Sequence, residues 1–164
     1  EGDLERDFHT CVGLRAELKG NAFDSVKLAA TRQMLPRYLG DATPQGHTDP
    51  RIRAIVAEVP LAADFDPATL AQPAVPLGLV RAGQDRWLVP RFHIDVVRAA
   101  CTPCELLVDN PRAGHGALLS PPPVDLAPLE ARLLGTDQTL SAEQIAASQQ
   151  RIVDFFVRHL ASAR

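Results

Sequence analysis

The 164-residue sequence lacks long apolar runs and lacks an excess of positive charge. No stretch approaches the roughly 18 uninterrupted apolar residues of a membrane-spanning helix. The net charge of −3 argues against nucleic-acid binding, because proteins that bind nucleic acid usually carry a basic stripe. Hydrophobic residues still make up 46% of the chain, which is typical of a folded domain with a real core.

The beginning of the chain lacks both an initiator Met and a recognisable leader peptide. Because the first residue is Glu1, we expect a chain that has been trimmed at its N-terminus. Any leader would then lie upstream, which leaves the compartment open between the cytoplasm and an exported location.

Cysteine and histidine are too few and too scattered for a metal centre. A zinc site takes four ligands, and the sequence has only one C-x-x-C, at Cys101 and Cys104, and no H-x(3–5)-H pair. We therefore expect neither a metal nor a cofactor. The C-x-x-C pair could be redox-active, but it follows a helical pattern and leads into a strand, which favours buried or incidentally paired thiols. His93, within the same helical pattern, is expected to be exposed or half-buried and not to take part in chemistry.

The hydrophobic pattern divides the chain into two parts. Residues 1–47 carry apolar residues at helical spacings, which predicts a helical, cap-like segment. Residues 48–164 predict an α/β domain, because short runs rich in branched apolar residues alternate with helical patterns. The expected strands are 51–60, 75–83 and 104–110, and the expected helices are 90–100, a short one at 126–134, and a final one that Ser141 caps. Two of the strand runs lack polar alternation, as in a parallel sheet covered on both faces.

An acid and a histidine follow two consecutive strands of this pattern. Asp85 comes after the strand at 75–83, and His115 comes after the strand at 104–110. One strand–helix–strand crossover separates them, so their loops should leave the same edge of the sheet side by side. A carboxylate bonded to one imidazole nitrogen fixes the tautomer and leaves the other nitrogen free as a base. We therefore predict that Asp85 and His115 act as a catalytic acid–histidine pair.

The motifs around these residues resemble the C-terminal half of an α/β-hydrolase. They are "DPRIRAIVAEVPLAADFD", "VPLGLVRAGQDRWLVPRFH", "CELLVDNPRAGHGALLSP" and "IVDFFVRHL". They are most similar to the predicted dienelactone hydrolases, a group related to platelet-activating-factor acetylhydrolase. The resemblance covers residues 49–120 and the final helix, and it matches 1–47 to the helical insertion that follows the nucleophile in that group. It implies hydrolysis of a carboxylic ester or lactone, with Asp85 as the triad acid and His115 as the triad histidine.

The nucleophile of such a triad is missing from the sequence. The G-x-S-x-G elbow is absent, and none of the five serines stands between glycines at the required spacing: Ser25, Ser120, Ser141, Ser148 and Ser162. In this fold the nucleophile precedes the acid in the chain. We therefore expect a serine or cysteine upstream of residue 1 or on a companion chain, and we expect the 164-residue chain alone to be inactive.

Several alternatives remain open at this point. Glu58, Asp64 and Asp66 follow the first strand and rival Asp85 as the triad acid. Trp87 and Leu88 could line an acyl pocket, although packing in the core is the more common role of such side chains. The alternative function is a non-catalytic α/β module that binds a partner or a small ligand, in which case His115 would be an ordinary turn residue.

Overall fold

The computed structural model describes residues 48–62, 65–117, 125–134 and 140–161, together with seven separate residues nearer the N-terminus. These seven are Phe23, Val26, Ala29, Ala30, Gln33, Met34 and Gly46, and those from Phe23 to Met34 are helical. The predicted boundary between a helical segment at 1–47 and a core at 48–164 falls outside the described residues, apart from Gly46 and Thr48. The division into two parts therefore stays a prediction.

Three parallel strands form one sheet in the order β1-β2-β3. They are β1 (Ile55–Glu58), β2 (Leu77–Ala82) and β3 (Glu105–Asn110). Each strand lies within the range expected from the sequence. The central strand β2 is the most buried of the three, as expected for a parallel strand that is covered on both faces. The α/β class is thereby confirmed for the described part of the chain.

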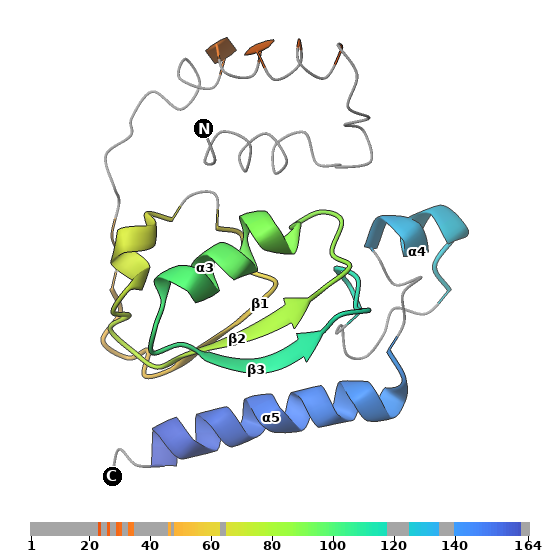
Figure 1. The fold of residues 1–164 in the computed structure, drawn as a ribbon. Coiled ribbons are helices and arrows are strands. Elements are labelled where there is room, and N and C mark those ends of the chain that lie inside the picture. The colour runs from red at the N-terminus through yellow and green to blue at the C-terminus, as the bar shows by residue number, and fades with distance from the viewer. Residues whose placement is uncertain are drawn as a thin grey trace.

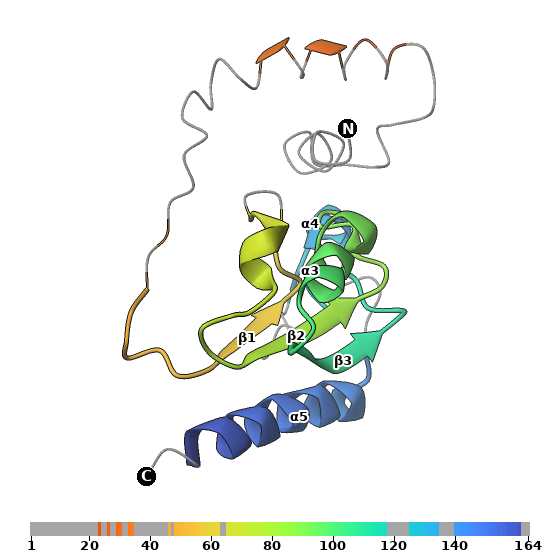
Figure 2. The same ribbon diagram turned by 60° about the vertical axis from the view of Figure 1, so that its left-hand side comes forward.

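Helices lie on both faces of the sheet, with α3 (Ile94–Ala100) on one face and α5 (Ala142–Ala161) on the other (Figures 1 and 2). The expected helix at 90–100 begins as a separate 3-10 turn, η3 (Pro90–Phe92), and another 3-10 turn, η2 (Pro67–Leu70), follows β1. The short helix α4 (Pro128–Leu134) stands where the sequence predicts it. None of the helices described, α5 included, is both long and apolar enough to cross a membrane.

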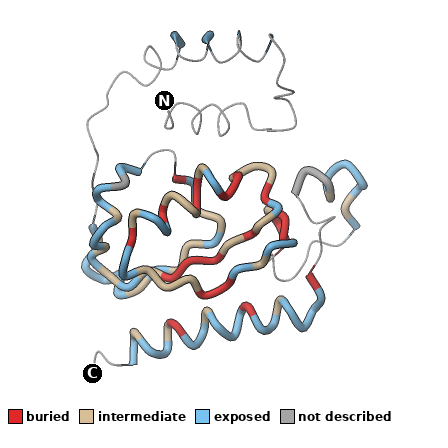
Figure 3. Tube along the Cα trace, in the orientation of Figure 1, coloured by how far each residue is buried: buried red, intermediate tan, exposed pale blue. Residues whose placement is uncertain are grey.

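The core is divided by the sheet into two apolar layers. Leu79 packs with Ile94 and Val97 on the α3 face. Val80 packs with Leu107 and Phe155 on the α5 face. Figure 3 shows buried residues along the strands and only isolated ones on α5. Because neighbouring residues of β2 point to opposite faces, this one strand anchors both layers.

The cysteines of the C-x-x-C motif form a disulfide between Cys101 and Cys104. Cys101 ends α3 and is buried, and Cys104 directly precedes β3. The bond therefore closes the turn at the start of β3, at the opposite end of that strand from His115.

The exit of β3 crosses very close to the exit of β2. The Gly83 amide donates to the carbonyl oxygen of Asn110 at 2.8 Å. A Cβ atom at Gly83 would lie 2.6 Å from the Cα of Pro111 and 2.7 Å from its carbonyl oxygen. Only glycine fits there, because the atoms it faces belong to the backbone and cannot rotate away.

We predict that Gly83→Ala lowers the free energy of unfolding by about 1–3 kcal/mol, because the added methyl group overpacks a backbone crossing. Urea denaturation followed by circular dichroism measures the change. Gly46→Ala is the matched control, since a Cβ there meets nothing within 4 Å and should change stability by less than about 0.5 kcal/mol. Equal unfolding midpoints for the two variants would contradict the prediction.

Candidate active site

Hydrogen bonds tie the loops after β2 and β3 together at the carboxyl edge of the sheet. Besides the bond from Gly83 to Asn110, the Gln84 amide donates to the carbonyl oxygen of Ala113 at 2.8 Å. The Gln84 side chain donates to the carbonyl oxygen of Pro111 at 3.3 Å. Each loop thus fixes the backbone of the other just before Asp85 or His115.

Asp85 is buried, and both of its carboxylate oxygens have partners. Its Oδ1 accepts hydrogen bonds from the amides of Trp87 at 2.8 Å and Leu88 at 2.9 Å. The side chain of Asp85 has no exposed surface. A buried carboxylate normally needs such donors, and here they come from the turn that Asp85 itself begins.

His115 completes the pair. Its Nδ1 lies 2.8 Å from Oδ2 of Asp85, and a third of its side chain is exposed. Since a carboxylate is an acceptor, Nδ1 carries the proton in this contact. Nε2 then has its lone pair free, and it has no hydrogen-bond partner among the described residues. The geometry matches that of a histidine oriented to act as a base through Nε2.

The carboxylate changes the acidity of the imidazole. The pKa of His115 is raised above its ordinary value, chiefly by the hydrogen bond to Asp85. Partial burial of His115 opposes this effect, and the negative charge of Asp85 adds to it. The imidazolium form, which appears after a proton has been accepted, is therefore stabilised.

The rival acids do not contact His115 in the described structure. Glu58 ends β1 and has no hydrogen bond or ion pair among the described residues, and burial raises its pKa. Asp66 caps η2 and accepts from the Ala68 amide at 2.9 Å. Asp64 lies outside the described residues. Asp85 is thus the candidate acid that the structure brings to His115, and its catalytic role stays a proposal.

Two contributions were missed by sequence reasoning. Trp87 and Leu88 were considered as pocket or core side chains, yet it is their backbone amides that hold Asp85. The signal was present, because an Asp two or three residues before such amides is typical of an Asx turn. The expectation that His93 is exposed or half-buried is wrong. His93 is fully buried, and its Nδ1 accepts from the Ala62 amide at 3.2 Å, which fixes the loop after β1.

None of the described serines lies at this site. Ser141 caps α5, exchanging hydrogen bonds with Gln144, and the Ser148 hydroxyl donates to the carbonyl oxygen of Gln144. Both roles are structural. Ser25, Ser120, Ser162 and Cys11 lie outside the described residues. Within the described ranges, no group of three or more His, Cys, Asp or Glu side chains could hold a metal ion.

We predict that Asp85→Asn lowers the pKa of His115, which an NMR titration of the imidazole nitrogens measures directly. Because the folded state raises this pKa, the stability gained from the imidazolium is complete below about pH 6.5 and is lost as pH rises through the raised value. The stability lost on substitution should therefore be larger at pH 5.5 than at pH 9. Asp66→Asn is the control and should leave the titration unchanged. A titration of His115 that is the same in both variants would disprove the assignment.

Comparisons of the chain with protein-family models, curated proteins and solved structures found no match. The contacts of Asp85 and His115 are facts of the structure. The resemblance of the surrounding motifs to α/β-hydrolases stays a prediction.

Proposed function

We propose that this chain is the C-terminal part of a serine-type, or cysteine-type, α/β-hydrolase that cleaves carboxylic esters or lactones. The observation that carries the proposal is the contact of 2.8 Å between Oδ2 of Asp85 and Nδ1 of His115. A buried carboxylate whose two oxygens both accept hydrogen bonds, and a partly exposed imidazole with one nitrogen left over, are the two parts of a triad that such a chain would supply. The α/β class and the parallel order β1-β2-β3 are compatible with that fold.

The reaction needs a nucleophile from an upstream segment or from a companion chain. Nε2 of His115 takes the proton of that hydroxyl or thiol while its oxygen or sulfur bonds to the substrate carbonyl carbon. The carbon–oxygen bond to the leaving group then breaks, and His115 gives the proton to the departing alkoxide. Water repeats the cycle on the acyl-enzyme, and the acid is released.

Asp85 supports each of these proton transfers without accepting the proton itself. Its contact with Nδ1 holds the imidazole ring in one orientation and stabilises the imidazolium between the two transfers. The amides of Trp87 and Leu88 keep the carboxylate in place. The choice of an ester or lactone rests on the resemblance of the motifs, which also implies that no cofactor takes part.

We predict that in the intact hydrolase, with its nucleophile, His115→Ala lowers kcat for a p-nitrophenyl ester by about 10⁴–10⁶-fold. Asp85→Asn should lower kcat by about 10⁴-fold, because the imidazole loses its orientation and its preferred tautomer. Steady-state kinetics with saturating ester give both values. Asp66→Asn and Glu58→Gln are matched controls and should keep kcat close to that of the unsubstituted enzyme.

Fluorophosphonate labelling of material purified from the native cells provides an independent check. A label on a serine or cysteine that copurifies with this chain, and that is lost in the His115→Ala variant, supports the hydrolase. Full ester hydrolysis by His115→Ala would remove His115 from the mechanism. The absence of any labelled residue would favour the non-catalytic module instead.

A further inference from the structure

His93 is a buried imidazole that the proposed reaction does not use. It lies at the junction of η3 and α3 and has no exposed surface. Its amide donates to the carbonyl oxygen of Pro90 at 3.1 Å, and its own carbonyl oxygen accepts from the amide of Val97 at 3.1 Å. These bonds hold the backbone of His93 on both sides, so its side chain leaves the junction in a defined direction. Polar side chains are buried in this way when their atoms have a hydrogen-bonding role.

The imidazole of His93 holds the loop after β1 through its Nδ1 atom. That atom accepts a hydrogen bond from the Ala62 amide at 3.2 Å. An amide nitrogen only donates, so Nδ1 of His93 carries a lone pair, whereas Nδ1 of His115 carries a proton. Ala62 is itself buried and packs with Leu79 and Ile94 on the α3 face of the sheet. The bond thus fixes the backbone of Ala62 relative to the start of α3.

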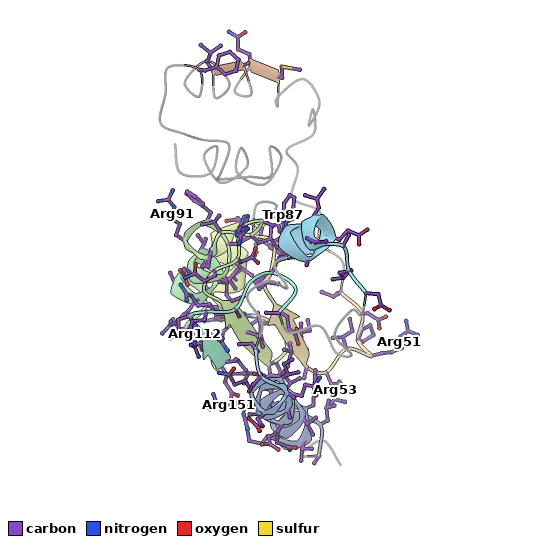
Figure 4. All side chains as sticks on the ribbon, turned by 90° about the vertical axis from the view of Figure 1, so that its right-hand side faces the viewer. Arg51, Arg53, Trp87, Arg91, Arg112 and Arg151 are labelled. Atoms are coloured by element: carbon purple, nitrogen blue, oxygen red, sulfur yellow. A yellow bond between two sulfur atoms is a disulfide. The ribbon has the colours of Figure 1, made fainter. Side chains whose placement is uncertain are left out.

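The loop that is held in this way crosses the carboxyl edge of the sheet. Val59 directly follows β1 and packs on the α5 side, against a cluster that Ile145 of α5 also contacts. Three residues later, Ala62 belongs to the cluster on the α3 side. The chain therefore passes from one face to the other between them, leaving the tip of β1 and rising on the side where α3 lies (Figure 2). Figure 4 looks onto this edge, with Arg91 marking η3 and Arg112 marking the loop after β3.

The cluster that Val59 contacts contains both residues that anchor the His115 loop. Ala113 and Ala117 stand two residues before and two residues after His115, and both are buried. The four buried members of the cluster are Ala82, Ala113, Ala117 and Leu140. The amide of Val59 also donates to a carbonyl oxygen of β2 at 3.1 Å. Val59 is thus held by the sheet through its backbone and supports the His115 loop through its side chain.

Packing matters most for the second half of the His115 loop. Its first half is tied to the loop after β2 by the hydrogen bond of 2.8 Å to the carbonyl oxygen of Ala113. The Ala117 amide, by contrast, donates within its own loop, to the carbonyl oxygen of Gly114 at 3.2 Å. Packing in the cluster with Val59 therefore places Ala117 relative to the sheet.

We propose that His93 is a positioning residue for His115 and acts through the loop after β1. By holding Ala62, it keeps Val59 against the residues on either side of His115. This inference rests on the proposed function and adds a residue outside the Asp85–His115 pair. The contact of 2.8 Å between Oδ2 of Asp85 and Nδ1 of His115 is then maintained by the loops after all three strands.

Two amide side chains in place of His93 separate this role from simple space filling. In His93→Asn the side-chain oxygen occupies the position of Nδ1 and still accepts from the Ala62 amide. In His93→Gln the terminal group reaches the position of Nε2 and leaves the Ala62 amide without that acceptor. Asn is the smaller side chain, so it leaves the larger cavity and should cost more stability than Gln. Positioning and space filling therefore predict opposite orders for the two variants.

NMR of the intact protein gives two readouts. Hydrogen exchange of the Ala62 amide, measured against that of amides in β2, reports on the loop after β1. Titration of the His115 imidazole reports on its contact with Asp85, because that hydrogen bond is the chief cause of its raised pKa. We expect His93→Gln to speed the exchange at Ala62 and to lower the pKa of His115, and His93→Asn to preserve both. Leu107→Ala is the control for lost stability, since it opens a cavity on the α5 face and should leave both readouts unchanged.

An unchanged titration of His115 in His93→Gln would overturn the proposal. So would a change in His93→Asn that equals or exceeds the one in His93→Gln, because the order would then follow cavity size. Val59→Ala covers the case in which His93→Gln does not fold, since it trims the contact and leaves His93 in place. It should also lower the pKa of His115, and an unchanged pKa there would equally overturn the proposal.

Steady-state kinetics of the intact hydrolase with a p-nitrophenyl ester test the consequence for catalysis. His93→Gln should lower kcat by about 10–100-fold with KM nearly unchanged, because a slightly displaced base loses rate and not substrate binding. Combining it with Val59→Ala should lower kcat no further, since both variants loosen the same contact. A loss in the double variant equal to the product of the two single losses would overturn the route through Val59.

The outcomes distinguish the two proposals. A protein that hydrolyses no ester, but in which the His115 titration follows these expectations, overturns the proposed hydrolase and keeps His93 as a residue that positions the Asp85–His115 pair. A protein that hydrolyses the ester equally well in its unsubstituted and His93→Gln forms keeps the hydrolase and overturns the role of His93.

Discussion

The backbone crossing at Gly83 is the constraint on which the candidate site depends. Pro111 passes so close to Gly83 that no side chain fits between them. This contact fixes the separation of two loops that belong to different strands. The short distance between Asp85 and His115 follows from it, because each residue lies only a few positions beyond the crossing. The site thus lies at the ends of two strands, and a single glycine allows the loops after them to approach closely.

Asp85 and His115 differ in how far their side chains are buried, and this difference fits two different roles. The carboxylate of Asp85 has no exposed surface and three hydrogen-bond partners, so it has little freedom to move. The imidazole of His115 keeps a third of its surface exposed and one nitrogen without a partner among the described residues. Glu58 shows the opposite pattern, since its carboxylate has no donor in the described structure. A fixed acid and an accessible base are what proton transfer from an outside nucleophile requires.

The strands and the meeting of Asp85 with His115 could be predicted because both follow from simple rules. Apolar runs bounded by Pro, Gly and Asn mark buried strands, and a right-handed crossover places consecutive exit loops together. Backbone contacts were harder to predict. The amides of Trp87 and Leu88 carry no side-chain signal of their own, and the donor that His93 meets is the amide of Ala62, 31 residues earlier in the chain. Such contacts are set by the tertiary fold and not by local pattern.

The described part of the sheet leaves apolar surface exposed on α5. A parallel sheet of three strands covers only part of α5, which leaves apolar side chains such as Val157 exposed. Exposed apolar side chains at helical spacing favour association with another apolar surface. Nε2 of His115, at the carboxyl edge of the same sheet, has no hydrogen-bond partner among the described residues. In the proposed hydrolase, the group that Nε2 faces is the nucleophile, so activity would depend on a side chain contributed from outside the described residues.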